Sequence, residues 1–159
     1  MTVLSTRRLT LAPPTPDDAA FVLELLNDPG WIQNIGDRGV RTEEDARGYI
    51  AGRFSQSPWF VVRDASGASL GMCGIVIREG LEHPDIGYAF LERYSGQGYA
   101  TEAAAVVLDH ARAQGHETIL GITAPDNTAS QRVLEKIGLR FVQMVDVPGW
   151  DRPSALYSV

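Results

Sequence analysis

Residues 91–103 read LERYSGQGYATEA, and this stretch gives the strongest indication of the fold. It begins at the end of a strand-like run and passes through Gly96 and Gly98. From there apolar residues recur at helical spacing over residues 100–111, and Gly115 is placed to end the helix. The chain therefore sets a strand, a tight Gly-x-Gly turn and a long amphipathic helix in direct succession.

Such a turn favours the binding of an anion. The first N–H groups of a helix have no partner inside it, and they lie at the positive end of the helix dipole. The same glycines can instead serve only to make a tight turn. A P-loop is excluded, because it needs a lysine after its second glycine and the only lysine is Lys136. A dinucleotide-binding turn needs a third glycine where this chain has Thr101, and the antiparallel hairpins expected before the turn also disfavour it.

Strand and helix patterns surround this stretch in the order β-α-α-β-β-β-α-β-α-β-β. Turn residues at 64–67 and 79–80 separate three successive strands and predict antiparallel hairpins. A loop is expected over residues 31–41. The order predicts an α/β (α+β) domain with a mixed sheet. Strands are expected at residues 9–11, 59–63, 70–78, 86–91, 118–123, 141–147 and 156–159, and the other helices at residues 15–26, 42–54 and 127–138.

Composition limits the kind of protein. A length of 159 residues without a linker predicts one domain, residues 1–159. The formal net charge of −6 argues against a nucleic-acid partner, because phosphate backbones require a basic surface. A single cysteine, Cys73, excludes an internal disulfide framework and a multi-thiolate zinc site, and no metal site is expected. No apolar run is long enough to cross a membrane, so we expect a cytoplasmic protein.

The central motif carries a family resemblance. Residues 95–103 resemble the acetyl-CoA motif of the GNAT N-acetyltransferases, in the form typical of the branch that resembles the ribosomal-protein N-terminal acetyltransferases (RimJ/RimL-like). The resemblance implies a mostly antiparallel central sheet of about six or seven strands flanked by about four helices. Further segments agree with it, namely residues 6–11, 16–19, 85–88, 127–130 and 134–138.

The resemblance also implies a site for acetyl-CoA, with no metal. The pyrophosphate would bind the N–H groups of residues 97–101, and the pantetheine arm would pair with the strand at Phe90 and Leu91. Asn127 and Ser130 would lie beside the pantetheine. The cofactor-binding residues expected are Phe90, Leu91, Ser95, Gly96, Gln97, Gly98, Tyr99, Ala100, Thr101, Asn127 and Ser130.

Transfer to an amine needs a base, because an ammonium ion cannot attack a thioester. Asp85 is our first choice among the carboxylates and histidine near the hairpin strands, ahead of Glu79, Glu82 and His83. Ser130 resembles the family's proposed hydroxyl donor to the leaving thiolate. The tyrosine acid that some relatives place seven residues after the asparagine is absent, since that position is Leu134.

The resemblance implies an acyltransferase that moves an acetyl group from acetyl-CoA to a primary amine by direct attack in a ternary complex. The acceptor could be a protein N-terminus, a polyamine, an amino sugar or another small amine, and the overall acidity is compatible with a cationic one. Similar proteins often form homodimers. The alternative is a non-catalytic acyl-CoA-binding or sensing domain of the same fold.

Overall fold

One eight-stranded sheet organises the chain in the computed structural model, which describes residues 2–159. Its strand order is β1-β2-β3-β4-β5-β6-β8-β7, and every neighbouring pair is antiparallel except β5 and β6. This confirms the mixed, mostly antiparallel sheet. The strands are β1 (Leu4–Ser5), β2 (Leu9–Ala12), β3 (Trp59–Asp64), β4 (Ser69–Val76), β5 (Asp85–Phe90), β6 (Leu120–Thr123), β7 (Arg140–Val145) and β8 (Ser154–Ser158).

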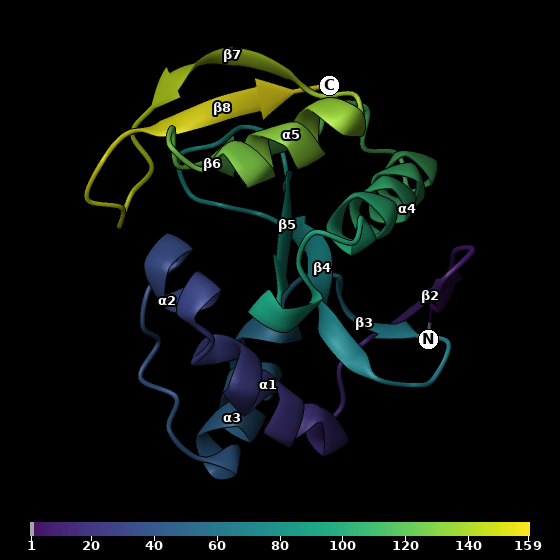
Figure 1. Cartoon of the computed structure of the whole chain (residues 1–159). Helices are drawn as coiled ribbons and strands as arrows, with labels where there is room; N and C mark the ends of the chain where they lie inside the picture. The colour runs from purple at the N-terminus through teal and green to yellow at the C-terminus, as the bar shows by residue number, and fades with distance from the viewer. Residues whose placement is uncertain (1) are drawn as a thin grey trace.

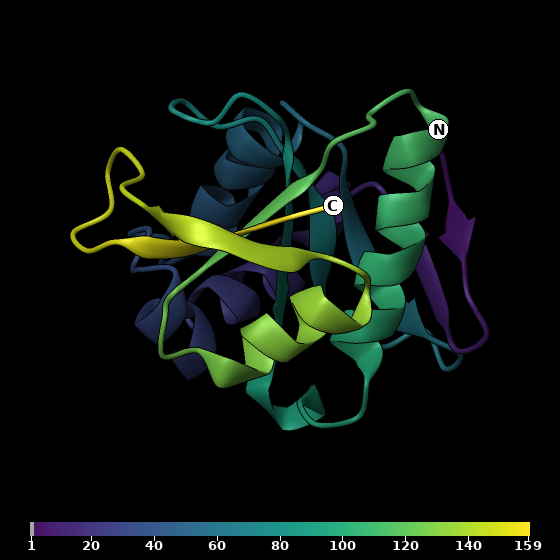
Figure 2. The same cartoon turned by 90° about the horizontal axis from the view of Figure 1, so that it is seen from above.

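The helices form two layers on opposite faces of the sheet (Figures 1 and 2). Side chains along β3 alternate between the two faces of the sheet and so contribute to two separate hydrophobic clusters. Phe60 and Val62 pack with α4 and α5, whereas Val61 packs with α1 and α3. The helices are α1 (Ala19–Leu26), α2 (Pro29–Asn34), α3 (Glu43–Tyr49), α4 (Tyr99–Ala113) and α5 (Thr128–Lys136), and a π-helical turn, Ile50–Phe54, follows α3.

Two elements were not expected. The short helix α2 replaces the first part of the loop predicted over residues 31–41, because Asp28 caps it by accepting a hydrogen bond from the N–H of Gly30, with Pro29 in the first turn. The sequence Asn-Asp-Pro-Gly stops one helix and starts another. The strand β1 has only two residues, so no alternation marks it in the sequence.

The feature that shapes the molecule is the divergence of β5 and β6. These strands are parallel and pair at a single position, Asp85 with Leu120, where the Leu120 N–H donates to the Pro84 carbonyl. Beyond that bridge they separate, and the turn before α4 lies near the far end of β5 (Figure 1). The sheet therefore opens beside the Gly-x-Gly turn. No helix within residues 2–159 is long and apolar enough to cross a membrane.

Candidate functional site

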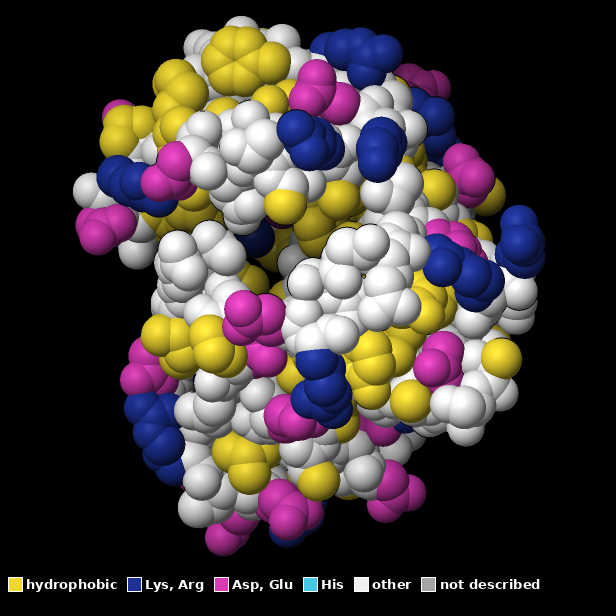
Figure 3. Space-filling view, viewed as in Figure 1, with side chains coloured by type: hydrophobic (Ala, Val, Ile, Leu, Met, Phe, Trp, Pro, Cys, Tyr) yellow, Lys and Arg dark blue, Asp and Glu magenta, His cyan; other side chains and the backbone are white. Residues whose placement is uncertain are grey.

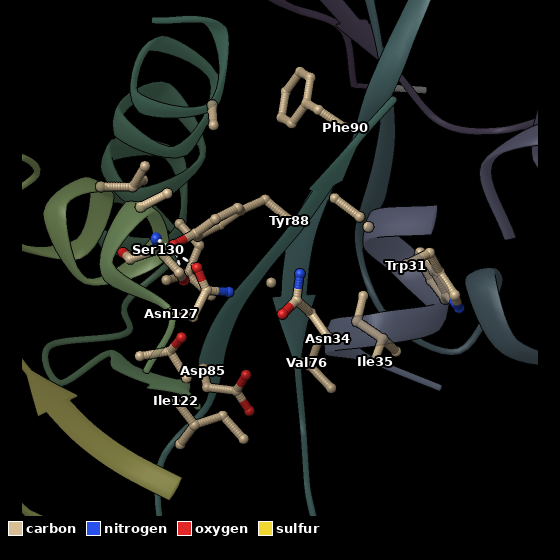
Figure 4. Close-up of a pocket in the computed structure, with 18 of the residues that line it drawn as sticks. Trp31, Asn34, Ile35, Val76, Asp85, Tyr88, Phe90, Ile122, Asn127 and Ser130 are labelled. Carbon is tan, nitrogen blue, oxygen red and sulfur yellow. Dashed lines mark hydrogen bonds between the residues drawn. The ribbon is translucent and has the colours of Figure 1, made fainter. Parts of the chain in front are cut away.

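A cavity of about 840 Å³ lies where the sheet opens. One wall is formed by α2 and the π-helical turn, and the other by the start of α4 and by α5, while β5 runs between them. Figure 3 shows the hollow between the two halves of the molecule, and Figure 4 shows side chains from both walls converging on it. The cavity therefore joins the glycine turn to residues of β5.

The glycine turn is built by two left-handed residues. Gly96 has φ 76° and Gly98 has φ 81°, a region that favours glycine. Gly98 is the N-cap of α4, and within residues 2–159 no side chain caps this helix. Its first N–H groups are therefore open to an external acceptor. The turn residues that line the cavity are Ser95, Gly96, Gly98, Tyr99, Ala100 and Thr101, whereas Gln97 lies outside the lining.

Glu102 stabilises the start of α4 through hydrogen bonds to the N-terminal segment. It accepts hydrogen bonds from the Thr6 hydroxyl and from Arg8, whose Nε lies 2.8 Å from Oε1. Burial acts to raise the pKa of Glu102, but these hydrogen bonds outweigh it and hold the pKa below its ordinary value. The Arg8 guanidinium also lies 4.5 Å from the centre of the Tyr99 ring. The first turn of α4 is thus tied to the segment before β2.

The backbone of β5 presents N–H groups to the cavity side. The Leu91 N–H, just after β5, donates to the Leu70 carbonyl of the partner strand β4 at 3.0 Å. In an antiparallel pair alternate residues face the partner strand, so the N–H groups of Tyr88 and Phe90 face the other way, towards the gap beside β6. The strand therefore offers two donors in the opening of the sheet.

Leu91 has a different role from the one expected. Its side chain is fully buried in the core against α1 and α3, its N–H is paired, and its carbonyl accepts from Tyr94. It does not line the cavity. Of the two residues expected to pair with the pantetheine arm, only Phe90 directs its N–H towards the gap beside β6.

Three polar side chains from β5 and α5 meet on one wall (Figure 4). The Tyr88 hydroxyl lies 2.7 Å from Ser130 Oγ and 3.1 Å from the Ser130 carbonyl. Asn127 caps α5 by accepting from the Ser130 N–H at 3.2 Å. Burial raises the pKa of Tyr88, so this side chain stays a neutral hydroxyl. Ser130 thus belongs to a hydroxyl pair, and the sequence did not identify Tyr88 as its partner.

Asp85 is a buried carboxylate at the start of β5. Its side chain is 1% exposed, and Oδ2 accepts from Arg78 Nε at 2.8 Å. Oδ1 has no hydrogen-bond partner among the described residues. Burial raises the pKa of Asp85 to about 6 against the opposing effect of Arg78. Asp85 lines the cavity, and its carboxylate can take up a proton near neutral pH.

The other candidate bases are placed differently. Glu79, Glu82 and His83 are exposed on the hairpin that joins β4 to β5. None of them lines the cavity. The structure brings only Asp85 of this group to the site. In the part of the chain that the structure describes, no three His, Cys, Asp or Glu side chains gather as a metal site would require.

An aromatic wall faces these groups. Tyr49 packs edge-on against Phe54 at 5.1 Å between ring centres, and Phe54 lies 5.2 Å from Trp59. Trp59 lies over two strand glycines: a Cβ at Gly74 would come within 2.9 Å of its ring, and one at Gly87 within 3.0 Å. All three aromatic residues line the cavity. In the sequence only Gly74 and Gly87 hint at this aromatic wall, and a glycine within a strand does not by itself indicate a binding site.

Trp31, expected in a loop near the acceptor, belongs to α2 and is largely buried. Its Nε1 donates to the Gly36 carbonyl at 3.1 Å, which holds the loop after α2. Trp31 therefore supports this wall of the cavity. Trp150 lies near Arg78, whose guanidinium is 5.6 Å from the ring centre.

Within residues 2–159, the parallel strands β5 and β6 diverge, the N–H groups of Tyr88 and Phe90 face the gap between them, and no side chain caps the helix at the glycine turn. This arrangement can hold an elongated anionic ligand along a strand. The family model for the acetyltransferase (GNAT) domain matches residues 8–140. The chain belongs to the GNAT family and is an acyltransferase.

Similar proteins agree with this assignment. YkkB of Bacillus subtilis strain 168 is 31% identical, over 98% of this chain and 94% of YkkB. A GNAT-family acetyltransferase from Bacillus anthracis is similar in structure, with a TM-score of 0.85 and 26% identity over 99% of this chain and 98% of that one. RimL, a ribosomal L7/L12 alpha-N-protein acetyltransferase solved with coenzyme A, shares the fold with a TM-score of 0.85 at 16% identity, over 99% of this chain and 97% of that chain.

Proposed function

We propose that this protein transfers the acetyl group of acetyl-CoA to a primary amine by direct attack within a ternary complex. The observation that carries the proposal is the continuity of the cavity. It joins an uncapped helix start, the free N–H groups of β5 and a buried carboxylate in one space. Binding of coenzyme A by the fold neighbour RimL supports the choice of cofactor.

The cofactor would lie along β5. Its pyrophosphate would accept hydrogen bonds from the N–H groups of residues 97–101, where the helix dipole also favours negative charge. The N–H groups of Tyr88 and Phe90 would pair with the pantetheine arm and polarise the thioester carbonyl. Asn127 would bind the same arm from α5, and its cap of α5 leaves the amide nitrogen free of any partner among residues 2–159.

An ammonium must lose two protons to become an amide nitrogen. It gives the first to Asp85 through Oδ1, or through a water bound to it, and the nitrogen then attacks the thioester carbon. The C–S bond breaks, the sulfur leaves as a thiolate, and the nitrogen releases its second proton to the solvent as the amide forms. The hydroxyl pair of Tyr88 and Ser130 stabilises the thiolate by donating a hydrogen bond. A strong acid is not required, because a thiol has a pKa of roughly 8.5.

The cofactor site is tested with one substitution and a matched control. Ala100→Arg places a long side chain in the first turn of α4, within the cavity lining. Ala113→Arg makes the same change at the exposed end of the same helix. We expect calorimetric titration to show acetyl-CoA binding to the wild type and to Ala113→Arg, and none to Ala100→Arg. Equal affinities in all three would show that the turn does not bind the cofactor.

A further inference from the structure

The cavity is far more basic than the chain that forms it. The whole chain carries a net charge of −6, yet the side chains lining the cavity include five cations and one acid. Two of the cations, Arg132 and Lys136, lie on α5 beside the proposed cofactor site. Of the other three, Arg38 and Arg53 come from the wall opposite α5, and Arg78 pairs with Asp85 of β5, which runs between the walls.

These three arginines come from separate segments. Arg38 follows α2, Arg53 lies in the π-helical turn and Arg78 follows β4. Arg38 and Arg53 form no ion pair with any residue of the described chain, 2–159. Arg78 uses Nε to hold Asp85, and no hydrogen bond within the described residues engages its two terminal nitrogens. This half of the cavity therefore has unused donors for an anion.

The same half has an apolar surface. Tyr49, Phe54 and Trp59 form the aromatic wall already described, and Trp59 has room because β4 and β5 place glycines beneath its ring. A ligand in this half meets aromatic side chains and arginines, and the only carboxylate among the lining residues is Asp85. The wall suits an apolar body, while the arginines suit a negative group.

We propose, resting on the proposed function, that the acceptor is a primary amine that also carries an anionic group on an aromatic or apolar body. The amine lies at Asp85, and the anion lies against Arg53 and Arg38, with the body on the aromatic wall. A polycation such as a polyamine does not fit, although the overall acidity of the chain is compatible with one. Charges lining the cavity outweigh distant surface charges, which salt screens beyond about 8 Å.

Matched pairs of amines test the proposal, because each pair differs only in the anion. 4-(2-Aminoethyl)benzoate is compared with 2-phenylethylamine for a carboxylate, and tyramine phosphate with tyramine for a phosphate, with spermidine as the polycationic acceptor. The readout is kcat/KM from thiol release with saturating acetyl-CoA. We expect the amine that carries the anion, in at least one pair, to exceed the amine that lacks it by about tenfold or more, since a charge-assisted hydrogen bond is lost without the anion.

Two variants locate the anion. Arg53→Gln and Arg38→Gln should each lower kcat/KM for the amine that carries the anion by about tenfold and leave kcat/KM for the amine that lacks it unchanged. Arg112→Gln, an exposed arginine near the end of α4 outside the cavity, should change neither. Both cavity arginines are exposed, so their loss leaves no buried charge unpaired.

Several results would overturn the proposal. They are equal use of the two members of each pair, a preference in both pairs for the amine that lacks the anion, a preference for spermidine, or unchanged discrimination in both variants. A panel with no turnover at all, despite tight acetyl-CoA binding, would overturn it as well. Absence of acetyl-CoA binding by the wild type is a separate result, and it would refute the proposed function itself.

Discussion

The buried carboxylate of Asp85 should make stability depend on pH in a direction opposite to that of most acidic groups. Burial raises its pKa from 3.8 to about 6, so between these values the folded chain binds a proton more tightly than the unfolded chain does. By linkage, the free energy of unfolding falls as the pH rises through this window. The variant Asp85→Asn cannot ionise and should lose this contribution.

The size of the effect follows from the shift. A pKa raised from 3.8 to about 6 corresponds to roughly 3 kcal/mol in total, of which about 2 kcal/mol appears between about pH 4.5 and about pH 7.5. The assay is urea denaturation of the wild type and of Asp85→Asn across that range. The difference in unfolding free energy between the two should change by about 2 kcal/mol, with the wild type losing stability relative to the variant as the pH rises.

The control is Glu82→Gln, which removes an exposed carboxylate from the same hairpin. It makes the same change in net charge without touching a buried group. A difference between wild type and Asp85→Asn that stays constant over the range would show that Asp85 titrates as a solvated carboxyl. Asp85 would then be ionised well below neutral pH and would be a poor base for the amine.

Two further predictions concern the walls of the cavity. Tyr88→Phe removes the hydroxyl beside Ser130 and should lower kcat roughly tenfold with little change in acetyl-CoA affinity, as measured by thiol release and calorimetry; unchanged kcat would remove Tyr88 from the mechanism. Gly98→Ala forces a side chain into the left-handed region, with its Cβ 3.3 Å from Arg8, and should cost about 1 kcal/mol of stability and weaken acetyl-CoA binding. A variant as stable as the wild type would show that the turn is not constrained.

Much of the fold could be predicted because local patterns and packing agree. The apolar spacing over residues 100–111 predicted α4, and the turn residues between strands predicted the antiparallel hairpins. The start of α2 was missed because Asp28 and Pro29 serve both as an ending for α1 and as a beginning for α2. The sequence around these residues does not show whether the chain continues as a loop or as a second helix, because that depends on how the next segment packs.

The site was predictable only in part. Short motifs determine the local geometry of the glycine turn and of Ser130, and apart from Gln97 these residues line the cavity. The role of Leu91 depends on which N–H groups face β4, a register that no single strand reveals. The basic lining depends on Arg38 and Arg53, which are far apart from Arg78 in the sequence and look like ordinary surface residues there.

A turnover assay is the most direct test of whether this protein transfers the acetyl group of acetyl-CoA to an amine. The wild type is mixed with acetyl-CoA and an amine panel, free thiol is followed with time, and the acetylated amine is identified by mass spectrometry. We expect thiol release that requires an amine, produces acetylated amine in equal amount and disappears in Ala100→Arg. Tight acetyl-CoA binding with no thiol release for any amine would contradict it and would favour a domain that binds the cofactor without using it.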